Sequence, residues 1–160
     1  SGAYSIAFAR AISDLHSEIL DLAEVVPLTQ GHILQAGLSG RVTTRVGDML
    51  RDPLGENYDL ILVSAICHMF SVEENRSLFE RAYRALAPGG RFVIQDFILE
   101  PDKTAPRFAA LFALNMLVGT RSGSSYSEPE YTAWLRDAGF SEIRRVRLAG
   151  PAGLLLALRP

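Results

Sequence analysis

Apolar and polar residues alternate along the chain with two periods, one typical of strands and one typical of helices. Short apolar runs predict strands at residues 17–22, 41–48, 58–66, 91–99, 142–149 and 153–159. Longer segments with apolar residues near helical spacing predict helices at residues 3–13, 23–36, 71–86, 106–118 and 128–139. Because the strands alternate with helices over most of the chain, the pattern favours an α/β fold with a parallel sheet covered on both faces.

Several local signals refine this prediction. Ile6, Ala7 and Ala11 lie near helical spacing and are expected on the inner face of the first helix. Gly37 is expected to end the second helix in a left-handed conformation. The continuous apolar run at residues 58–66 is typical of a strand covered on both faces. The short GPAG link between the last two strands indicates that they pair antiparallel, because a parallel crossover needs more chain.

The helix predicted at residues 71–86 has the clearest boundaries. Ser71 and Glu74 can form a capping box, in which each side chain satisfies a backbone N–H at the open helix end. Its apolar stripe consists of Leu78, Phe79, Ala82 and Leu86. The sequence APGG then ends the helix. A second capping box, of Ser127 and Glu130, opens the last predicted helix.

Composition narrows the class of protein. Of the 160 residues, 48% are hydrophobic and 21% are charged, and the formal net charge is −2, which is typical of a globular domain. The basic residues are scattered, and their densest group, at residues 144–147, includes an apolar residue, which argues against a nucleic-acid partner. No apolar run reaches the length of a membrane span, so no membrane partner is expected. The single cysteine, Cys67, favours a reducing, cytoplasmic location.

Candidate chemistry gathers at the carboxyl ends of the predicted strands, where open α/β sheets bind their ligands. These ends carry Asp21, Asp48, His68 and Asp96. An acid at a strand end can accept both hydroxyls of a ribose when it lies about 20 residues after a glycine-rich turn. Gly2 precedes Asp21 by such a distance, and Asp48 with its neighbouring methionine could hold an adenine.

Each of these residues also has a purely structural interpretation. Asp21 could cap the helix at residues 23–36, and Asp48 could form a turn. Cys67 is expected to be a small buried residue. His68 and Asp96, each taken alone, could be structural, and their joint placement at one end of the sheet favours a functional site.

Taken together, these residues resemble those of a known family, the caffeic-acid-type, two-domain O-methyltransferases that use S-adenosylmethionine and act on small molecules. The resemblance rests on GDM at residues 47–49, on ICH at 66–68 before the acidic start of a helix, and on APGG at 87–90 before a strand. Matching stretches cover almost the whole chain. The resemblance implies a Rossmann-like fold of three layers, with a mostly parallel sheet and an antiparallel last strand.

The resemblance also implies roles for single residues. His68 corresponds to the catalytic base, and Asp96 to an acid that orients it. Asn115 and Met116 correspond to the wall of the acceptor pocket. The cofactor contacts that it implies are Gly2, Asp21, Leu22, Asp48, Met49 and Ser64. Ser64 stands where many members have a lysine.

The implied chemistry fits these residue types. The sulfonium methyl group is already activated, so no metal ion is expected, and the enzyme must align the acceptor and deprotonate it. An unperturbed histidine titrates near pH ~6.5, which suits a base at neutral pH. A phenol, which resembles tyrosine with a pKa of ~10, needs such help. A carboxylate on the far imidazole nitrogen would fix the tautomer.

The chain also departs from the pattern of the family. The resemblance places a central strand and most of a glycine-rich loop before Ser1, and a helical domain for dimerisation before those. It therefore predicts that the 160 residues are one catalytic domain, a fragment of a longer homodimer. The absent strand would lie between the strands that end at Asp21 and Ser64. Ser125 lies in a segment where many relatives have an acidic residue, and Met69 also replaces one.

The predicted function is methyl transfer from S-adenosylmethionine to a hydroxyl, in particular a phenol, of a small bacterial natural product, with S-adenosylhomocysteine as the second product. Carbon and nitrogen acceptors are alternatives within the family. A non-catalytic domain of the same fold is another alternative, which Ser125 favours and the retained His68 and Asp96 oppose. A nicotinamide-dependent dehydrogenase would fit the acid at Asp21, but GDM and the antiparallel last strand fit a methyltransferase better.

Overall fold

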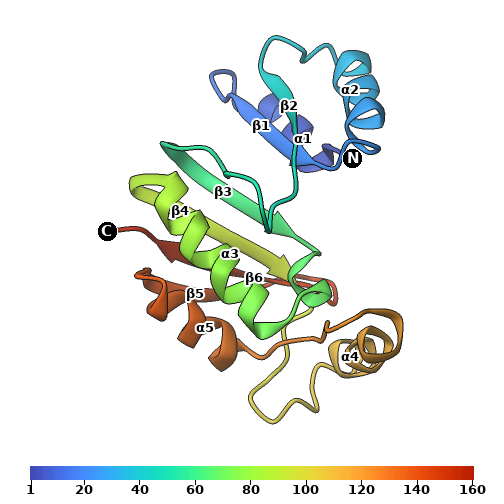
Figure 1. The fold of residues 1–160 in the computed structure, drawn as a ribbon, viewed down its shortest axis with the longest axis vertical. Helices are drawn as coiled ribbons and strands as arrows, with labels where there is room; N and C mark the ends of the chain where they lie inside the picture. Colours follow the sequence, from blue (N-terminus) through green and yellow to red (C-terminus); the bar gives the residue numbers. More distant parts are fainter. The chain divides into compact units, whose positions relative to one another are not determined.

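The computed structural model describes all 160 residues, which divide into two compact units at residues 1–54 and 55–160. Each unit has its own sheet and its own helices (Figure 1). The predicted α/β class is confirmed.

The first unit is a small parallel α/β element. Its helices and strands are α1 (Ala3–Ala11), β1 (Ser17–Asp21), α2 (Val26–Gln35) and β2 (Val42–Val46). β1 and β2 pair in parallel, in a register that runs from Ser17 opposite Val42 to Asp21 opposite Val46. Its buried core consists of Ala9, Ile33, Leu38 and Val42.

Two details of this unit differ from the prediction. α2 begins at Val26 instead of residue 23, because Pro27 occupies its first turn, the place in a helix where proline is best tolerated. The inner face of α1 carries Ala9, whereas Ala7 and Ala11 are exposed. The expected left-handed Gly37 is confirmed, with φ of 70° directly after the C-cap of α2.

The second unit contains a mixed sheet of four strands. Its elements are β3 (Tyr58–Ser64), η1 (Cys67–Met69), α3 (Val72–Ala85), β4 (Leu86–Asp96), α4 (Arg107–Gly119), α5 (Glu128–Asp137), β5 (Ser141–Arg147) and β6 (Gly153–Leu158). The strand order is β3-β4-β6-β5. β3 and β4 are parallel, and β6 runs antiparallel to both of its neighbours, as predicted for the last strand.

The helix α3 matches its sequence signals. Ser71 accepts a hydrogen bond from the Glu74 backbone N–H at 3.2 Å, and the Glu74 carboxylate accepts one from the Ser71 N–H at 2.8 Å. The residues of the predicted apolar stripe, Leu78, Phe79, Ala82 and Leu86, are at most 1% exposed, but Leu86 lies outside the helix and begins β4, which was predicted to start at residue 91. α3 and α5 pack side by side on the same face of the sheet (Figure 1). α4 lies to one side of this sheet and packs mainly against η1.

The prediction that residues 58–66 form a strand covered on both faces is wrong. β3 is an edge strand that pairs only with β4, and its Leu60 is 48% exposed. α3 and α5 cover the same face of its sheet, and Ile61 and Leu62 of β3 are only partly buried. The strand also ends at Ser64 and not at residue 66. In the first unit, β1 is likewise paired on one side only, with β2.

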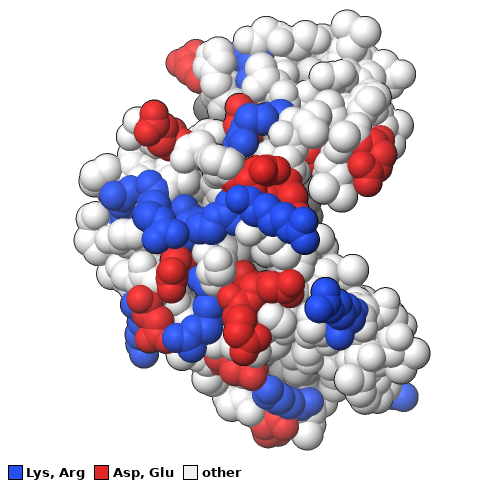
Figure 2. Space-filling model, viewed as in Figure 1, with Lys and Arg blue, Asp and Glu red and all other residues white.

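Charged side chains of both signs adjoin one another on the face of the molecule shown in Figure 2. The ion pairs of the second unit include those of Arg76 with Asp137 and of Lys103 with Glu130, at 2.9 and 2.7 Å. None of the helices has both the length and the apolar character that crossing a membrane requires. The cytoplasmic location stays a prediction.

Candidate active site

A left-handed turn brings His68 to the carboxyl end of β3. Ala65 directly follows this strand and has φ of 51°, a conformation that residues other than glycine rarely adopt. Its backbone N–H donates to the Gln95 carbonyl of β4 at 2.8 Å, which fixes the start of the turn. The short helix η1 then carries Cys67 and His68, both buried.

Asn75 of α3 stabilises this turn through hydrogen bonds of its side chain. Its side-chain amide donates to the carbonyl oxygens of Cys67, Phe70 and Ser71, at 3.0, 3.3 and 3.0 Å. Asn75 itself is fully buried. Because buried carbonyl groups need partners, one amide that serves three of them makes the turn a defined structure and not a loose connection.

His68 and Asp96 form a buried pair. The Nδ1 atom of His68 lies 2.7 Å from Oδ1 of Asp96, and the two side chains are 9% and 1% exposed. Oδ2 of Asp96 accepts the backbone N–H of His68 at 3.2 Å, and Oδ1 also accepts that of Phe97 at 2.8 Å. Since the ionised carboxylate can only accept, Nδ1 carries the proton in this pair, and the lone pair of the neutral ring lies on Nε2.

The ring of His68 also contacts two aromatic side chains. The ring of Phe112 stands nearly perpendicular to it, at 87° and a centroid distance of 4.8 Å. Phe97 lies at 6.0 Å and 25°. The loop after α4 approaches the backbone of the same histidine, because a Cβ atom at Gly123 would overlap the His68 carbonyl oxygen. Only glycine fits there without a shift of the loop or of η1.

Burial raises the pKa of three ionisable groups near the turn. Burial raises the pKa of the Cys67 thiol well above its usual value, and the charge of Asp96 adds to this. Burial likewise raises the pKa of Tyr126 to about 12, and its hydroxyl donates to the Phe70 carbonyl at 2.5 Å. The pKa of Tyr131 is raised for the same reason and by the nearby Cys67 and Asp96. These three groups therefore stay protonated at neutral pH.

The predicted cofactor residues of the first unit lie around the carboxyl ends of β1 and β2. Oδ1 of Asp21 accepts only the N–H of the next residue, Leu22, at 2.9 Å. The N-cap position of α2 is Val25, so Asp21 is not the cap of that helix. The N–H of Gly47 donates to the Asp21 carbonyl at 3.0 Å, which places the turn with Asp48 beside the end of β1.

Asp48 and Gly2 also have structural roles. Oδ1 of Asp48 accepts the N–H of Leu50 at 2.9 Å, so this residue does form the turn that its residue type suggested. Gly2 has φ of 72°, and a Cβ atom there would lie 3.1 Å from side-chain atoms of Ile19 and Thr29. The Thr29 hydroxyl is buried without a partner. Met49 is partly exposed, and Leu22 is 46% exposed.

These groups are compatible with the nucleoside part of S-adenosylmethionine. The second carboxylate oxygen of Asp21 has no hydrogen bond from the protein, and the side chain lies at a strand end, as a ribose acceptor requires. Asp21 itself is partly exposed. No group of three or more His, Cys, Asp or Glu side chains is arranged to hold a metal ion.

The remaining predicted residues of the second unit lie at varied depths. The Ser64 hydroxyl hydrogen-bonds to the side chain of Gln95, its register partner on β4. On α4, Met116 is 8% exposed, whereas Asn115 is exposed. Ser125 is 2% exposed, and its hydroxyl has no partner.

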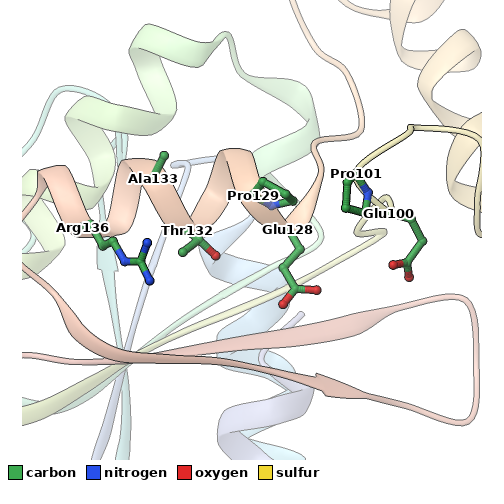
Figure 3. Close-up of a pocket in the computed structure, with 7 residues that line it drawn as sticks. All are labelled: Glu100, Pro101, Glu128, Pro129, Thr132, Ala133 and Arg136. Atoms are coloured by element: carbon green, nitrogen blue, oxygen red, sulfur yellow. The ribbon is translucent and has the colours of Figure 1, made fainter.

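The second unit also has a groove of about 470 Å³ between α5 and the segment after β4 (Figure 3). It is lined by Glu100, Pro101, Glu128, Pro129, Thr132, Ala133 and Arg136. Arg145, whose side chain is 8% exposed, bridges Glu100 and Glu128 at 3.1 and 3.2 Å. Neither His68 nor Asp96 lines the groove, so it is separate from the histidine site.

Sequence reasoning missed several contacts of this site. The packing of Phe97 and Phe112 on His68 depends on the fold, although an aromatic residue directly after Asp96 was a visible signal. Phe112 was visible only as one of many apolar residues in its helix. No signal in the sequence marks Gly123 as the residue that admits the His68 carbonyl.

Comparison with known proteins gives a consistent result. A family model described as an O-methyltransferase domain matches residues 1–141. The 3-hydroxy-5-methyl-1-naphthoate 3-O-methyltransferase of Streptomyces sahachiroi is 40% identical over 151 residues, which cover 94% of this chain and 44% of that protein. The L-tyrosine C(3)-methyltransferase of Streptomyces lavendulae is 32% identical and covers 97% and 44%.

Among solved structures, PigF of Serratia, an S-adenosyl-L-methionine-dependent methyltransferase solved with SAH, superimposes with a TM-score of 0.90. It is 32% identical, and the match covers 99% of this chain and 47% of that one. The chain thus spans about half the length of the curated relatives it matches.

Proposed function

The chain belongs to the O-methyltransferase domain family, whose cofactor is S-adenosylmethionine, and from this premise we propose that it methylates a phenolic hydroxyl of a small natural product. His68 is the general base of this reaction, and Asp96 orients it. The observation that carries the proposal is the buried pair of His68 Nδ1 and Asp96 Oδ1 at 2.7 Å. The name of the naphthoate methyltransferase supports a phenol on an aromatic acid as the acceptor.

The pair supplies what deprotonation of a phenol needs. With Nδ1–H donated to Asp96, the lone pair of Nε2 is free to take the proton of the acceptor hydroxyl. The ring then becomes a cation, and the adjacent carboxylate stabilises it in a site from which most water is excluded. Because a free phenol has a pKa of ~10, this proton transfer is expected to contribute a factor of about 10²–10⁴ to the rate.

The first unit would hold the cofactor through groups at the carboxyl ends of β1 and β2. The free carboxylate oxygen of Asp21 would accept the ribose hydroxyls, and Asp48 and Met49 would hold the adenine. The bound cofactor supplies a methyl group that is already activated by its sulfonium. The protein therefore contributes orientation and proton removal.

The test exchanges His68 for Gln and measures transfer of a labelled methyl group to 3-hydroxy-5-methyl-1-naphthoate, together with calorimetric binding of S-adenosylhomocysteine. Turnover is expected to fall by about 10²-fold or more, since Gln cannot act as a base. Cofactor affinity is expected to stay unchanged, because no predicted cofactor contact is altered. Unchanged turnover with intact binding would remove His68 from the role of base.

A carbon acceptor is the second candidate, because the L-tyrosine C(3)-methyltransferase is among the relatives. The two products are isomers of equal mass, so free hydroxyl groups are acetylated before mass spectrometry of the product. A methyl ether would be formed on oxygen, whereas methylation of the ring leaves the hydroxyl free for later derivatisation. The same assay with L-tyrosine as acceptor addresses the carbon reaction directly.

We further propose a homodimer as the assembly of the whole protein. The support is the apolar surface of α4, where Leu111, Leu114, Leu117 and Val118 are each more than half exposed. Exposed apolar patches of this kind mark sites of association. Sedimentation velocity on the whole protein tests it, and a monomer at micromolar concentration would contradict it.

A further inference from the structure

The position of the His68 ring is only partly determined by Asp96. One side-chain hydrogen bond, from Nδ1 to Oδ1, fixes one atom of the ring. A single hydrogen bond of this kind leaves the plane of the ring free to tilt about it. Nε2, the atom that has to meet the acceptor, lies on the far side of the ring and moves most when it tilts. Something else must therefore hold the plane of the imidazole.

Two aromatic side chains provide this restraint. Phe112 meets the His68 ring at 87° with a centroid distance of 4.8 Å, within the range in which edge-to-face aromatic pairs are favourable. Phe97 lies at 25° and 6.0 Å from the same ring. Phe97 and Phe112 also meet each other, at 4.6 Å and 62°. The three rings thus restrain one another, and a tilt of the imidazole would break two of these contacts.

The two phenylalanines reach the histidine from different elements. Phe97 directly follows β4, and its backbone N–H donates to Asp96, so it is tied to the same carboxylate as His68. Phe112 comes from α4, whose main packing partner among the elements is η1, the short helix of His68. Phe112 is therefore the direct ring contact between α4 and the base. The same helix carries Asn115 and Met116, the predicted acceptor residues.

We propose that Phe112 is a positioning residue that holds the plane of the His68 imidazole, so that Nδ1 stays on Asp96 while Nε2 faces the acceptor hydroxyl. Its ring fulfils this role by edge-to-face contact, and not by touching the reacting atoms. This inference rests on the proposed function, because it assigns Nε2 of His68 the task of taking the proton. A small misplacement of a reacting group can lower a rate by about 10²-fold.

The variant Phe112→Leu removes the aromatic ring and keeps an apolar side chain of helix-favouring type. Phe108→Leu is the matched control, because Phe108 belongs to the same helix and contacts both Phe97 and Phe112 but has no ring contact with His68. Phe112→Tyr keeps the ring and is expected to behave as the original protein. Phe112→Met serves as the second variant if the leucine variant does not fold.

The first readout is the nitrogen resonances of the His68 ring, measured by long-range ¹H–¹⁵N spectra of the chain and assigned with His68→Gln. A fixed ring with the proton on Nδ1 gives two well separated nitrogen signals. In Phe112→Leu the two signals are expected to shift and broaden, because a ring that tilts about the Nδ1–Oδ1 hydrogen bond exchanges between several orientations. Phe108→Leu is expected to leave them in place. Unchanged signals in Phe112→Leu, or equal changes in both variants, would overturn the proposal.

The second readout is turnover with 3-hydroxy-5-methyl-1-naphthoate. Phe112→Leu is expected to lower kcat by about 10-fold, on the order allowed for a misplaced catalytic group, with a KM change of less than about twofold. In a His68→Gln background the same exchange is expected to have no further effect, because the ring it positions is gone. Equal losses in both backgrounds would show that Phe112 acts on the acceptor or on the fold.

The two readouts distinguish the failure of this inference from that of the proposed function. If His68→Gln retains full turnover, His68 is not the base, and the proposed function fails. The ring resonances still decide whether Phe112 fixes the imidazole. If His68→Gln loses turnover and Phe112→Leu changes neither the resonances nor kcat, the proposed function stands and the role of Phe112 is wrong.

Discussion

Both carboxylate oxygens of Asp96 accept hydrogen bonds, among them those from the Nδ1 and the backbone N–H of His68 and from the N–H of Phe97. The exchange Asp96→Asn replaces one of these oxygens with a donor. It is expected to lower methyl transfer by about 10²-fold or more, because the ring loses its fixed tautomer. It is also expected to cost about 1–3 kcal/mol of stability, since a buried donor then faces an N–H.

The control for this exchange is Asp137→Asn, the same chemical change on an exposed carboxylate that pairs with Arg76. It is expected to alter the free energy of unfolding by less than about 0.5 kcal/mol and to leave turnover unchanged. Kinetics and urea unfolding of both variants provide the comparison. Similar losses in the two would contradict a special role of Asp96.

For Ser125 we expect that removal of the hydroxyl does not lower the stability of the fold. Its hydroxyl is buried without a hydrogen-bond partner, and burying such a group is unfavourable. Ser125→Ala is therefore expected to leave stability unchanged or to raise it by up to about 1 kcal/mol, with turnover retained. Urea unfolding measures the first and a methyl-transfer assay the second. A marked loss of stability would mean that the hydroxyl has a partner in solution.

The raised pKa of Tyr126 predicts that the stability of the fold decreases at alkaline pH. Burial raises its folded-state pKa to about 12, above the value of ~10 for an unfolded tyrosine. The folded state thus keeps a proton that the unfolded state loses first, so this contribution is complete below pH ~10 and declines as pH rises toward 12. The raised pKa of Tyr131 acts in the same direction.

Ultraviolet titration of the phenolate band tests this dependence. Tyr126→Phe is expected to remove one late-titrating group and to flatten the fall of stability between pH ~10 and 12. It also removes the hydrogen bond to the Phe70 carbonyl, so stability at neutral pH is expected to fall as well. A wild-type titration in which every tyrosine ionises near pH ~10 would contradict the buried placement.

At the scale of elements, the cap of α3 is a separate source of stability for the site, because η1 lies directly before this helix. Ser71→Ala removes the acceptor for the Glu74 N–H and is expected to cost about 0.5–2 kcal/mol. Thermal unfolding measures this loss, with a decrease in Tm of about 2–4 °C per kcal/mol for a chain of this size. Ser77→Ala, on an exposed position of the same helix, is the control.

The same element shows what the sequence could predict. Ser71, Glu74 and the apolar stripe are local signals, so the start, the end and the buried face of α3 were correct. The exposure of Leu60 on β3 was not, because an apolar run indicates a buried strand but not whether a neighbour exists on each side. Likewise, the proline that delays the start of α2 was visible in the sequence, yet its effect on the boundary was underestimated.

In the site, too, the sequence pattern predicted some contacts, and others depend on the packing of distant segments. His68 and Asp96 were predicted to meet because parallel strands bring their carboxyl ends to one edge of a sheet, and β3 and β4 do so. The contacts that complete the pair come from α4 and from the loop at Gly123, which no period or motif links to the strands. Long-range packing of this kind is decided by the fold as a whole.

At the scale of the whole molecule, the chain consists of two units of unequal core size. The first, residues 1–54, has a two-stranded sheet and a core of only four buried residues. Two strands with a small core give little stability. Its backbone amides are therefore expected to exchange with deuterium faster than those of β4 and β6 in the second unit.

Binding of S-adenosylhomocysteine is expected to slow this exchange in the first unit, because Asp21 and Asp48 lie there. At 100 times the dissociation constant, a ligand that binds only the folded unit stabilises it by about 2.7 kcal/mol, or roughly a hundredfold in exchange. Hydrogen–deuterium exchange by mass spectrometry measures both units at once. Protection confined to the second unit would contradict the assignment of the nucleoside contacts.

The burial of Cys67 has a practical consequence for studying this site. It is the only thiol of the chain, it is fully buried, and it precedes His68 directly. A thiol reagent can modify it only in molecules whose turn after β3 has transiently opened, since the closed thiol is inaccessible and protonated. The labelling rate in native buffer therefore reports the free energy of that local opening. Cys67 is therefore a native probe of how often the histidine site opens, and no engineered residue is needed.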